Sequence, residues 1–111
     1  MQMIEIRQYT RASGEVVFES WLAALQDERA AARIEARLER LVSGNFGDCR
    51  PVGGGVWELR IDCGAGYRVY YAMIGRMCVL LLCGGDKRRQ SADIARAIGY
   101  LRDYRQRSVS L

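Results

Sequence analysis

The sequence predicts an α+β domain in which helices pack on a mostly antiparallel, four-stranded sheet. Segments with apolar residues three or four positions apart and segments with every second residue apolar occur in the order strand, helix, helix, three strands, helix. Because three predicted strands follow one another with no helix between them, they can pair as antiparallel neighbours. The 111 residues show neither a repeat nor a linker, so we expect a single domain over residues 1–111.

The first half of the chain predicts one strand and two helices. Residues 4–9 alternate apolar and polar side chains, as a half-buried strand does. Ser13 is a candidate N-cap for the first helix. Asp27 can cap a second helix over residues 28–43, which Gly44 ends.

The second half predicts a loop, three strands and a last helix. The loop contains the only proline and three consecutive glycines, but these lack the spacing of a phosphate-binding loop, so we expect a flexible entry to the next strand. Two glycines at 84–85 are expected to end the last strand, and Ser91 can cap the last helix. The loop covers residues 44–55, the strands 56–62, 67–74 and 77–83, and the helix 91–107.

Positive charge is concentrated near the end of the chain. There are 17 Lys and Arg residues against 13 Asp and Glu, which gives a net charge of +4. Residues 1–83 contain ten of each sign, so the whole excess lies in residues 84–111. A basic end indicates a polyanionic partner or an acidic protein surface, and a basic helix that is merely solvated is the alternative.

The cysteine and histidine counts exclude several kinds of chemistry. Four cysteines without a C-x-x-C pair, and no histidine, argue against a zinc site and exclude catalysis through a histidine base. We therefore expect no metal and no cofactor, with Glu, Asp, Lys, Tyr or a cysteine of shifted pKa as acid or base. The longest apolar run, 77–83, is too short to span a membrane, and the N-terminus lacks an apolar signal segment, so we expect a cytoplasmic protein without membrane contact.

Strand parity gathers charged side chains on one face of the predicted sheet. In the strands over 56–62 and 67–74, apolar residues alternate with other residues, and a shift of one position would turn a whole apolar set to solvent. The two apolar sets must therefore share the core face, and the alternate positions must share the opposite face. The chemically functional residues at those alternate positions are Glu58, Arg60, Asp62, Arg68 and Tyr70.

This charged face is a candidate site for phosphate chemistry. Lys87 follows the adjoining strand, so we expect it at the rim of the face. Guanidinium groups match phosphate oxygens, and Arg60 and Arg68 together with Lys87 would suit a phosphodiester transition state. Glu58 beside them could accept a proton. The alternative is that opposite charges on neighbouring strands only pair with one another.

A second basic surface is predicted on the helix over 28–43. At about 100° per residue, four arginines fall in one stripe beside the apolar stripe of this helix. Such a stripe could follow an RNA backbone, or it could be a solvated face. The candidate RNA-binding residues are Arg29, Arg33, Arg37 and Arg40, with Arg88 and Arg89 of the basic end.

Residues 47–104 resemble the RelE/ParE superfamily of toxin–antitoxin toxins, and within it the HigB-like addiction module killer proteins. The motifs that carry the resemblance are ELR at 58–60, GYRVYY at 66–71 and LLLCGGDK at 80–87, followed by Gln90, Asp93 and Ile94. The strand and two helices before them fit as well, so the resemblance covers nearly the whole chain. It implies a RelE-like β-α-α-β-β-β-α fold.

The resemblance also implies roles for the site residues. Arg68 falls on an arginine that stabilises the phosphate, and Arg60 and Glu58 fall on strand positions that hold catalytic groups in related toxins. Lys87 falls near a basic residue that follows the last strand. We expect Glu58 as the general base and either Lys87 or Tyr70 as the general acid. Some relatives use a histidine near the C-terminal end, and this chain has none.

The function that the resemblance implies is that of a type II toxin which enters the ribosomal A site and cleaves mRNA without a metal. The 2′-hydroxyl of the RNA attacks the adjacent phosphate, while the protein positions the reacting atoms and neutralises charge. The implied partners are the ribosome, mRNA and a cognate antitoxin, often a helix-turn-helix DNA-binding protein. A gyrase-binding poison and a catalytically silent RNA-binding domain are the alternatives, and the arginines of the charged face favour the nuclease.

Overall fold

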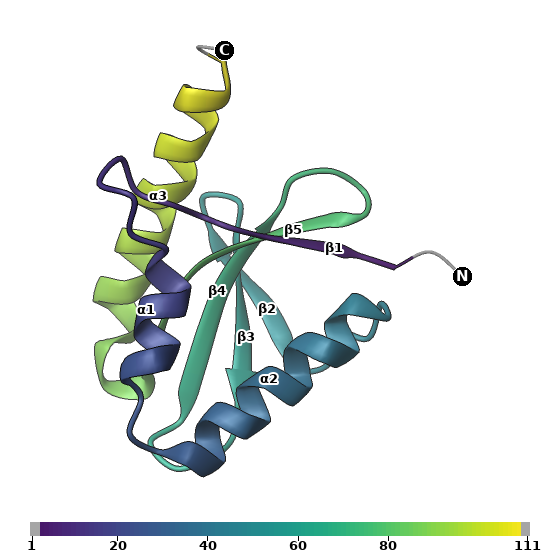
Figure 1. Cartoon of the computed structure of the whole chain (residues 1–111), viewed down its shortest axis with the longest axis vertical. Coiled ribbons are helices and arrows are strands. Elements are labelled where there is room, and N and C mark those ends of the chain that lie inside the picture. The colour runs from purple at the N-terminus through teal and green to yellow at the C-terminus, as the bar shows by residue number, and fades with distance from the viewer. Residues whose placement is uncertain (1–2, 110–111) are drawn as a thin grey trace.

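The computed structural model describes residues 3–109, which form five strands, three α-helices and one 3-10 turn (Figure 1). The predicted α+β class is confirmed. The elements are β1 (Glu5–Gln8), α1 (Val17–Ala24), α2 (Glu28–Val42), β2 (Cys49–Gly53), β3 (Val56–Ile61), β4 (Tyr67–Met73), β5 (Cys78–Asp86), η1 (Lys87–Arg89) and α3 (Gln90–Val109).

The strands form one sheet in the order β1-β5-β4-β3-β2. All neighbours are antiparallel except β1, which runs parallel to β5. The sheet is therefore mostly antiparallel, as predicted, but it has five strands where the sequence predicted four. The additional strand is β2, which lies within the predicted loop. The sequence did not predict β2, because a proline usually argues against a strand. Pro51 is tolerated here because β2 is an edge strand, and the register of its pairing with β3 shifts between Pro51 and Gly53.

Strand β5 continues through the two glycines that were expected to end it. Gly84 pairs with Val69 and Gly85 with Arg68. A Cβ atom on Gly84 would collide with the indole of Trp21, and one on Gly85 would collide with the carboxylate of Asp93. These glycines therefore allow a helix to approach each face of the strand closely. The sequence pattern alone does not distinguish glycines with this role from glycines that end a strand.

Of the three N-cap residues that the sequence predicted, one is confirmed. Asp27 caps α2, because its carboxylate accepts a hydrogen bond from the backbone N–H of Ala30 at 3.0 Å. Helix α1 begins only at Val17, since a bridge between Thr10 and Val16 holds the preceding segment as a loop. Ser91 is not the cap of α3, because the chain is already helical from η1 onward. The cap of η1 is Asp86, whose side chain accepts from the N–H of Arg88 at 2.9 Å.

Helices cover both faces of the sheet, so there are two cores. One core joins Phe18 of α1 and Ile34 of α2 to Leu59 and Val69 of the sheet. The other core lies under α3, where Ala97 and Leu101 pack with Tyr70 and Leu80. Figure 1 shows the lower part of α3 behind α1 at one side of the sheet, with α2 lying apart from α3. The face that carries Glu58 is therefore the face under α3, and its exposed part lies around the first turn of that helix.

We expect Gly84→Ala to lower the free energy of unfolding by about 1–3 kcal/mol, because the new methyl group must displace Trp21 from the backbone of β5. The matched control is Gly99→Ala in α3. No atom lies within 4 Å of a Cβ at Gly99, so this change should raise helix stability by up to about 1 kcal/mol. Urea denaturation of both variants measures the difference. Equal stability of the two would contradict the close packing at Gly84.

Candidate active site

A carboxylate without solvent contact lies at the centre of the charged face. The side chain of Glu58 on β3 is 0% exposed. One oxygen, Oε1, accepts from Nε of Arg50 at 3.0 Å. The other, Oε2, accepts from the hydroxyl of Tyr70 at 3.0 Å and from Nε2 of Gln90 at 2.8 Å. These partners come from β2, β4 and α3, so one charged group links three elements.

Arg68 lies beside this carboxylate without a hydrogen bond to it. Its Nε is 3.7 Å from Oε2 of Glu58, close enough for an ion pair, and it has no hydrogen-bond acceptor among residues 3–109. The side chain is 13% exposed. Arg68 is therefore held by charge rather than by a hydrogen bond at Nε, and this donor is buried without a hydrogen-bond partner among the described residues.

Arg60 faces Arg68 directly across the β3–β4 pair. Like charges in this register repel each other. Asp48 offsets the repulsion, because its Oδ1 accepts from Nη2 of Arg60 at 2.9 Å. This hydrogen bond lowers the pKa of Asp48, so the carboxylate remains charged well into the acidic range.

Tyr70 donates its hydroxyl to Glu58 deep beneath α3. Burial raises the pKa of Tyr70 strongly, and the charge of Glu58 raises it further. The phenol therefore stays protonated at neutral pH. Because both Tyr70 and Glu58 are 0% exposed, neither touches the surface that a substrate would reach.

Lys87 extends the site beyond the end of β5. A Cβ placed on Gly66 would lie 3.4 Å from the Cβ of Lys87 and 3.9 Å from Nη1 of Arg68. The two cations thus border the same glycine. Lys87, Arg88 and Arg89 are all exposed in η1, and Arg88 pairs with Asp86 at 3.3 Å.

The arginine stripe of α2 is divided between two uses. Arg37 is part of the fold, because it donates to the backbone oxygens of Arg60 at 2.6 Å and of Phe46 at 3.2 Å, and burial lowers its pKa. Arg33 and Arg40 are exposed and border a cavity of about 370 Å³ together with Ile61. Arg29 is also exposed. The stripe therefore lies on the α2 side of the sheet and does not join Glu58, except through the bond from Arg37 to the backbone of Arg60.

One residue of the site escaped the sequence analysis, and the burial of another was not predicted. Arg50 lies in the segment expected to be a loop, and only the pairing of β2 with β3 places it opposite Glu58. Asp93 is 2% exposed at the first turn of α3, where its Oδ1 accepts from Nη2 of Arg96 at 2.8 Å. Asp93 was named in the sequence only as part of the motif after LLLCGGDK, and an acidic residue in the first turn of a helix occurs on many helices, so neither signal predicts its burial.

The described part of the chain contains no cluster of three or more His, Cys, Asp or Glu side chains suited to a metal ion. The four cysteines are free thiols. Within residues 3–109 no helix is both long enough and apolar enough to cross a membrane.

Comparison with known proteins identifies the family. The family described as "Phage derived protein Gp49-like (DUF891)" matches residues 20–98. The chain belongs to this Gp49-like family, which is a phage-derived, toxin-like family of addiction module killers of the RelE/HigB type. The resemblance found in the sequence is thus confirmed at the level of a toxin-like family.

A close relative extends this relation to a second organism. An uncharacterized protein of Haemophilus influenzae is 52% identical over 82 residues, which cover 74% of this chain and 83% of that protein. Membership of a toxin-like family implies an antitoxin as partner.

We expect Glu58→Gln to lower the free energy of unfolding by about 3 kcal/mol, because it leaves Arg50 and Arg68 without their counter-charge. Asp48→Asn is the matched control. It removes the partner of Arg60 at the surface and should cost less than about 1 kcal/mol. Thermal and urea unfolding at neutral pH compare the two, and equal losses would contradict a special role for the buried carboxylate.

Proposed function

We propose that this protein is the toxin of a type II toxin–antitoxin module and acts as a ribosome-dependent, metal-independent mRNA endonuclease. The observation that supports this function best is a row of three cations: Arg68 lies beside the buried carboxylate of Glu58, Arg60 pairs opposite Arg68, and Lys87 borders the same glycine as Arg68. Three cations within one patch exceed what pairing with Glu58 and Asp48 requires. The RelE-like arrangement of the domain is part of the same proposal.

The reaction begins with attack of a ribose 2′-hydroxyl on the adjacent phosphorus. The bond from phosphorus to the 5′-oxygen breaks, which leaves a 2′,3′-cyclic phosphate on one fragment and a 5′-hydroxyl on the other. Negative charge grows on the non-bridging oxygens, where Arg68 and Arg60 stabilise it by hydrogen bonds. Because Nε of Arg68 is buried, this contact would be made by the exposed part of the side chain.

The exposure and hydrogen bonds of Lys87, Tyr70 and Glu58 favour different roles for them in proton transfer. The leaving 5′-oxygen needs a proton, and Lys87 is the exposed candidate donor, whereas Tyr70 is buried with its hydroxyl donated to Glu58. The attacking hydroxyl loses its proton to solvent. Glu58 could serve as a base only if Arg50 or Gln90 moved away, so we assign it a positioning role that holds Arg68 toward the substrate.

The exposed arginines outside the site would contact ribosomal RNA. Arg29, Arg33 and Arg40 on α2 and Arg88 and Arg89 in η1 are available for phosphate contacts. Arg37 is excluded from this group because its guanidinium bonds to backbone oxygens. In this proposal the protein acts in the cytoplasm, and the antitoxin is a helix-turn-helix DNA-binding protein that neutralises it.

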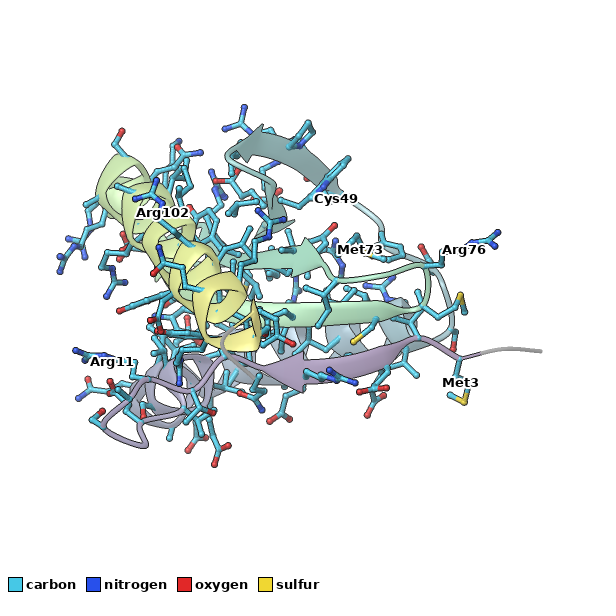
Figure 2. The ribbon with its side chains drawn as sticks, turned by 90° about the horizontal axis from the view of Figure 1, so that it is seen from above. Met3, Arg11, Cys49, Met73, Arg76 and Arg102 are labelled. Atoms are coloured by element: carbon cyan, nitrogen blue, oxygen red, sulfur yellow. The ribbon has the colours of Figure 1, made fainter. Side chains whose placement is uncertain are left out.

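Replacing Arg68 by alanine should reduce mRNA cleavage by about 10²–10³-fold, because it removes one preorganised donor to the transition-state phosphate. The measurement is primer extension on a translated mRNA in a reconstituted translation system, with naked mRNA in parallel. Arg76→Ala is the control. Figure 2 shows Arg76 projecting from the molecule on the side away from α3, so this variant should cleave at the wild-type rate.

New 5′ ends at ribosome-occupied codons, lost with Arg68→Ala, are the expected result. Wild-type cleavage by Arg68→Ala would remove Arg68 from the site. Intact mRNA with unimpaired translation would overturn the nuclease, and a gyrase cleavage assay would then test the other activity known in the superfamily.

The arginines of α2 should differ in a second assay. Arg33→Ala and Arg40→Ala should each weaken ribosome binding and lower the slope of log affinity against log salt by about 1, with little change in stability. Arg37→Ala should instead destabilise the fold, because three backbone oxygens lose their donor. Co-sedimentation with ribosomes at several salt concentrations, together with thermal unfolding, separates the two effects. An unchanged salt slope in both surface variants would contradict the phosphate contacts.

A further inference from the structure

A second cavity is bordered by residues of α1, β5 and α3. Its volume is about 380 Å³. It opens where β1 has ended, because β1 pairs with β5 only as far as Leu81. The residues that matter for its chemistry are Arg11, Ser20, Trp21, Cys83, Arg96 and Tyr100.

Two aromatic side chains form its walls. Trp21 packs against the backbone of β5 because Gly84 has no side chain. Tyr100 is held by stacking on Tyr9, with ring centroids 4.8 Å apart. Because both rings are fixed by neighbours, a flat ligand can stack without first ordering them.

A fixed cation lies at the same cavity. Arg96 is 47% exposed, and its Nη2 donates to the buried carboxylate of Asp93 at 2.8 Å. The second oxygen of Asp93 has no hydrogen-bond partner among residues 3–109, so the hydrogen bond of this carboxylate is the one from Arg96. Arg11 also borders the cavity but pairs with Glu15 at 3.1 Å. Burial raises the pKa of the Cys83 thiol to about 12, so the floor is uncharged.

We propose that this cavity binds a nucleotide, with the base against Trp21 and Tyr100 and the phosphate at Arg96. A planar apolar wall beside one exposed guanidinium is the combination that a base and its phosphate require. Ser20 and Glu15 offer a hydroxyl and a carboxylate at the rim, which can accept hydrogen bonds from base amino groups.

The cavity is close to the candidate active site. Gly84 lies on its border, and the next residue, Gly85, pairs with Arg68. Trp21 also meets Tyr67 edge to face, with centroids 6.3 Å apart, and Tyr67 immediately precedes Arg68. A nucleotide next to the scissile phosphate could therefore place its base here. The choice of RNA as the source of the nucleotide rests on the proposed function, whereas the site itself does not.

The test uses Trp21 as the reporter. In a full-length Trp57→Phe background Trp21 is the only tryptophan, and a stacked base should quench its fluorescence. The probe is cytidine 5′-monophosphate, and inorganic phosphate at the same concentration tests for binding of an anion alone. Saturable quenching by the nucleotide but not by phosphate is expected. Equal effects of the two would overturn the base-binding part, and no effect of either would overturn the site.

Two matched variants of α1 locate the binding. Ser20 and Ala23 are both exposed, but only Ser20 borders the cavity. Ser20→Phe should fill the cavity and weaken nucleotide binding at least tenfold, and Ala23→Phe should leave it unchanged. Arg96→Ala should weaken binding by about tenfold through loss of a charged hydrogen bond. Because this change also leaves Asp93 unpaired, thermal unfolding of every variant accompanies the titration. Equal affinity in Ser20→Phe and Ala23→Phe would overturn the location.

The same assay separates this inference from the proposed nuclease. In the Arg68→Ala variant, in which cleavage should fall by about 10²–10³-fold, saturable quenching of Trp21 by the mononucleotide should persist. A cytidine trinucleotide that binds at least tenfold tighter than the mononucleotide assigns the cavity to the path of an RNA strand. Equal affinities assign it to a free mononucleotide. If the wild type binds the nucleotide but does not cleave mRNA, the nucleotide site is supported and the nuclease is refuted. If it cleaves mRNA but does not bind the nucleotide, the nuclease is supported and the nucleotide site is refuted.

Discussion

A carboxylate removed from water needs partners that offset the cost of its burial, and Glu58 finds them on three elements. Arg50 comes from the edge strand β2, Tyr70 from β4 and Gln90 from the start of α3. The bonds that stabilise the charge therefore also determine where β2 and α3 lie. Arg68 is placed by the same charge at 3.7 Å. Both the position of the last helix and the concentration of arginines depend on this one group.

The division of the molecule into two faces follows from the sheet. The α3 face holds the candidate active site, and the opposite face holds α1, α2 and the larger set of aliphatic contacts. Arg37 connects the two, because it reaches from α2 to the backbone of Arg60. A stripe of like charges on one helix thus serves two purposes: one arginine closes the fold, and its exposed neighbours remain for an anionic surface.

Local patterns predicted the faces of the strands but not what covers them. Alternation placed Leu59 in the core and Glu58 on the opposite face, as the structure shows. It could not predict that Glu58 is buried, because the contact from Gln90 depends on the direction that α3 takes after β5. Strand β2 was not predicted, because Pro51 argues against a strand and is tolerated only at the edge of the sheet. Helical spacing placed Arg37 in an exposed stripe. The oxygens that bind it belong to Arg60 of β3 and to residues 46 and 48, which only the folded chain brings to α2.

The parallel pairing of β1 with β5 joins residues 5–8 to residues 78–81. Synthesis proceeds from the N-terminus, so the first strand has no sheet partner until most of the chain has emerged from the ribosome. The amide of Gln90 arrives later still, after every arginine of the charged face. Shorter chains released before that point contain the arginines but not the helix that covers Glu58. Formation of the charged face therefore depends on a residue that is synthesised after its arginines, and contacts so distant in sequence slow folding.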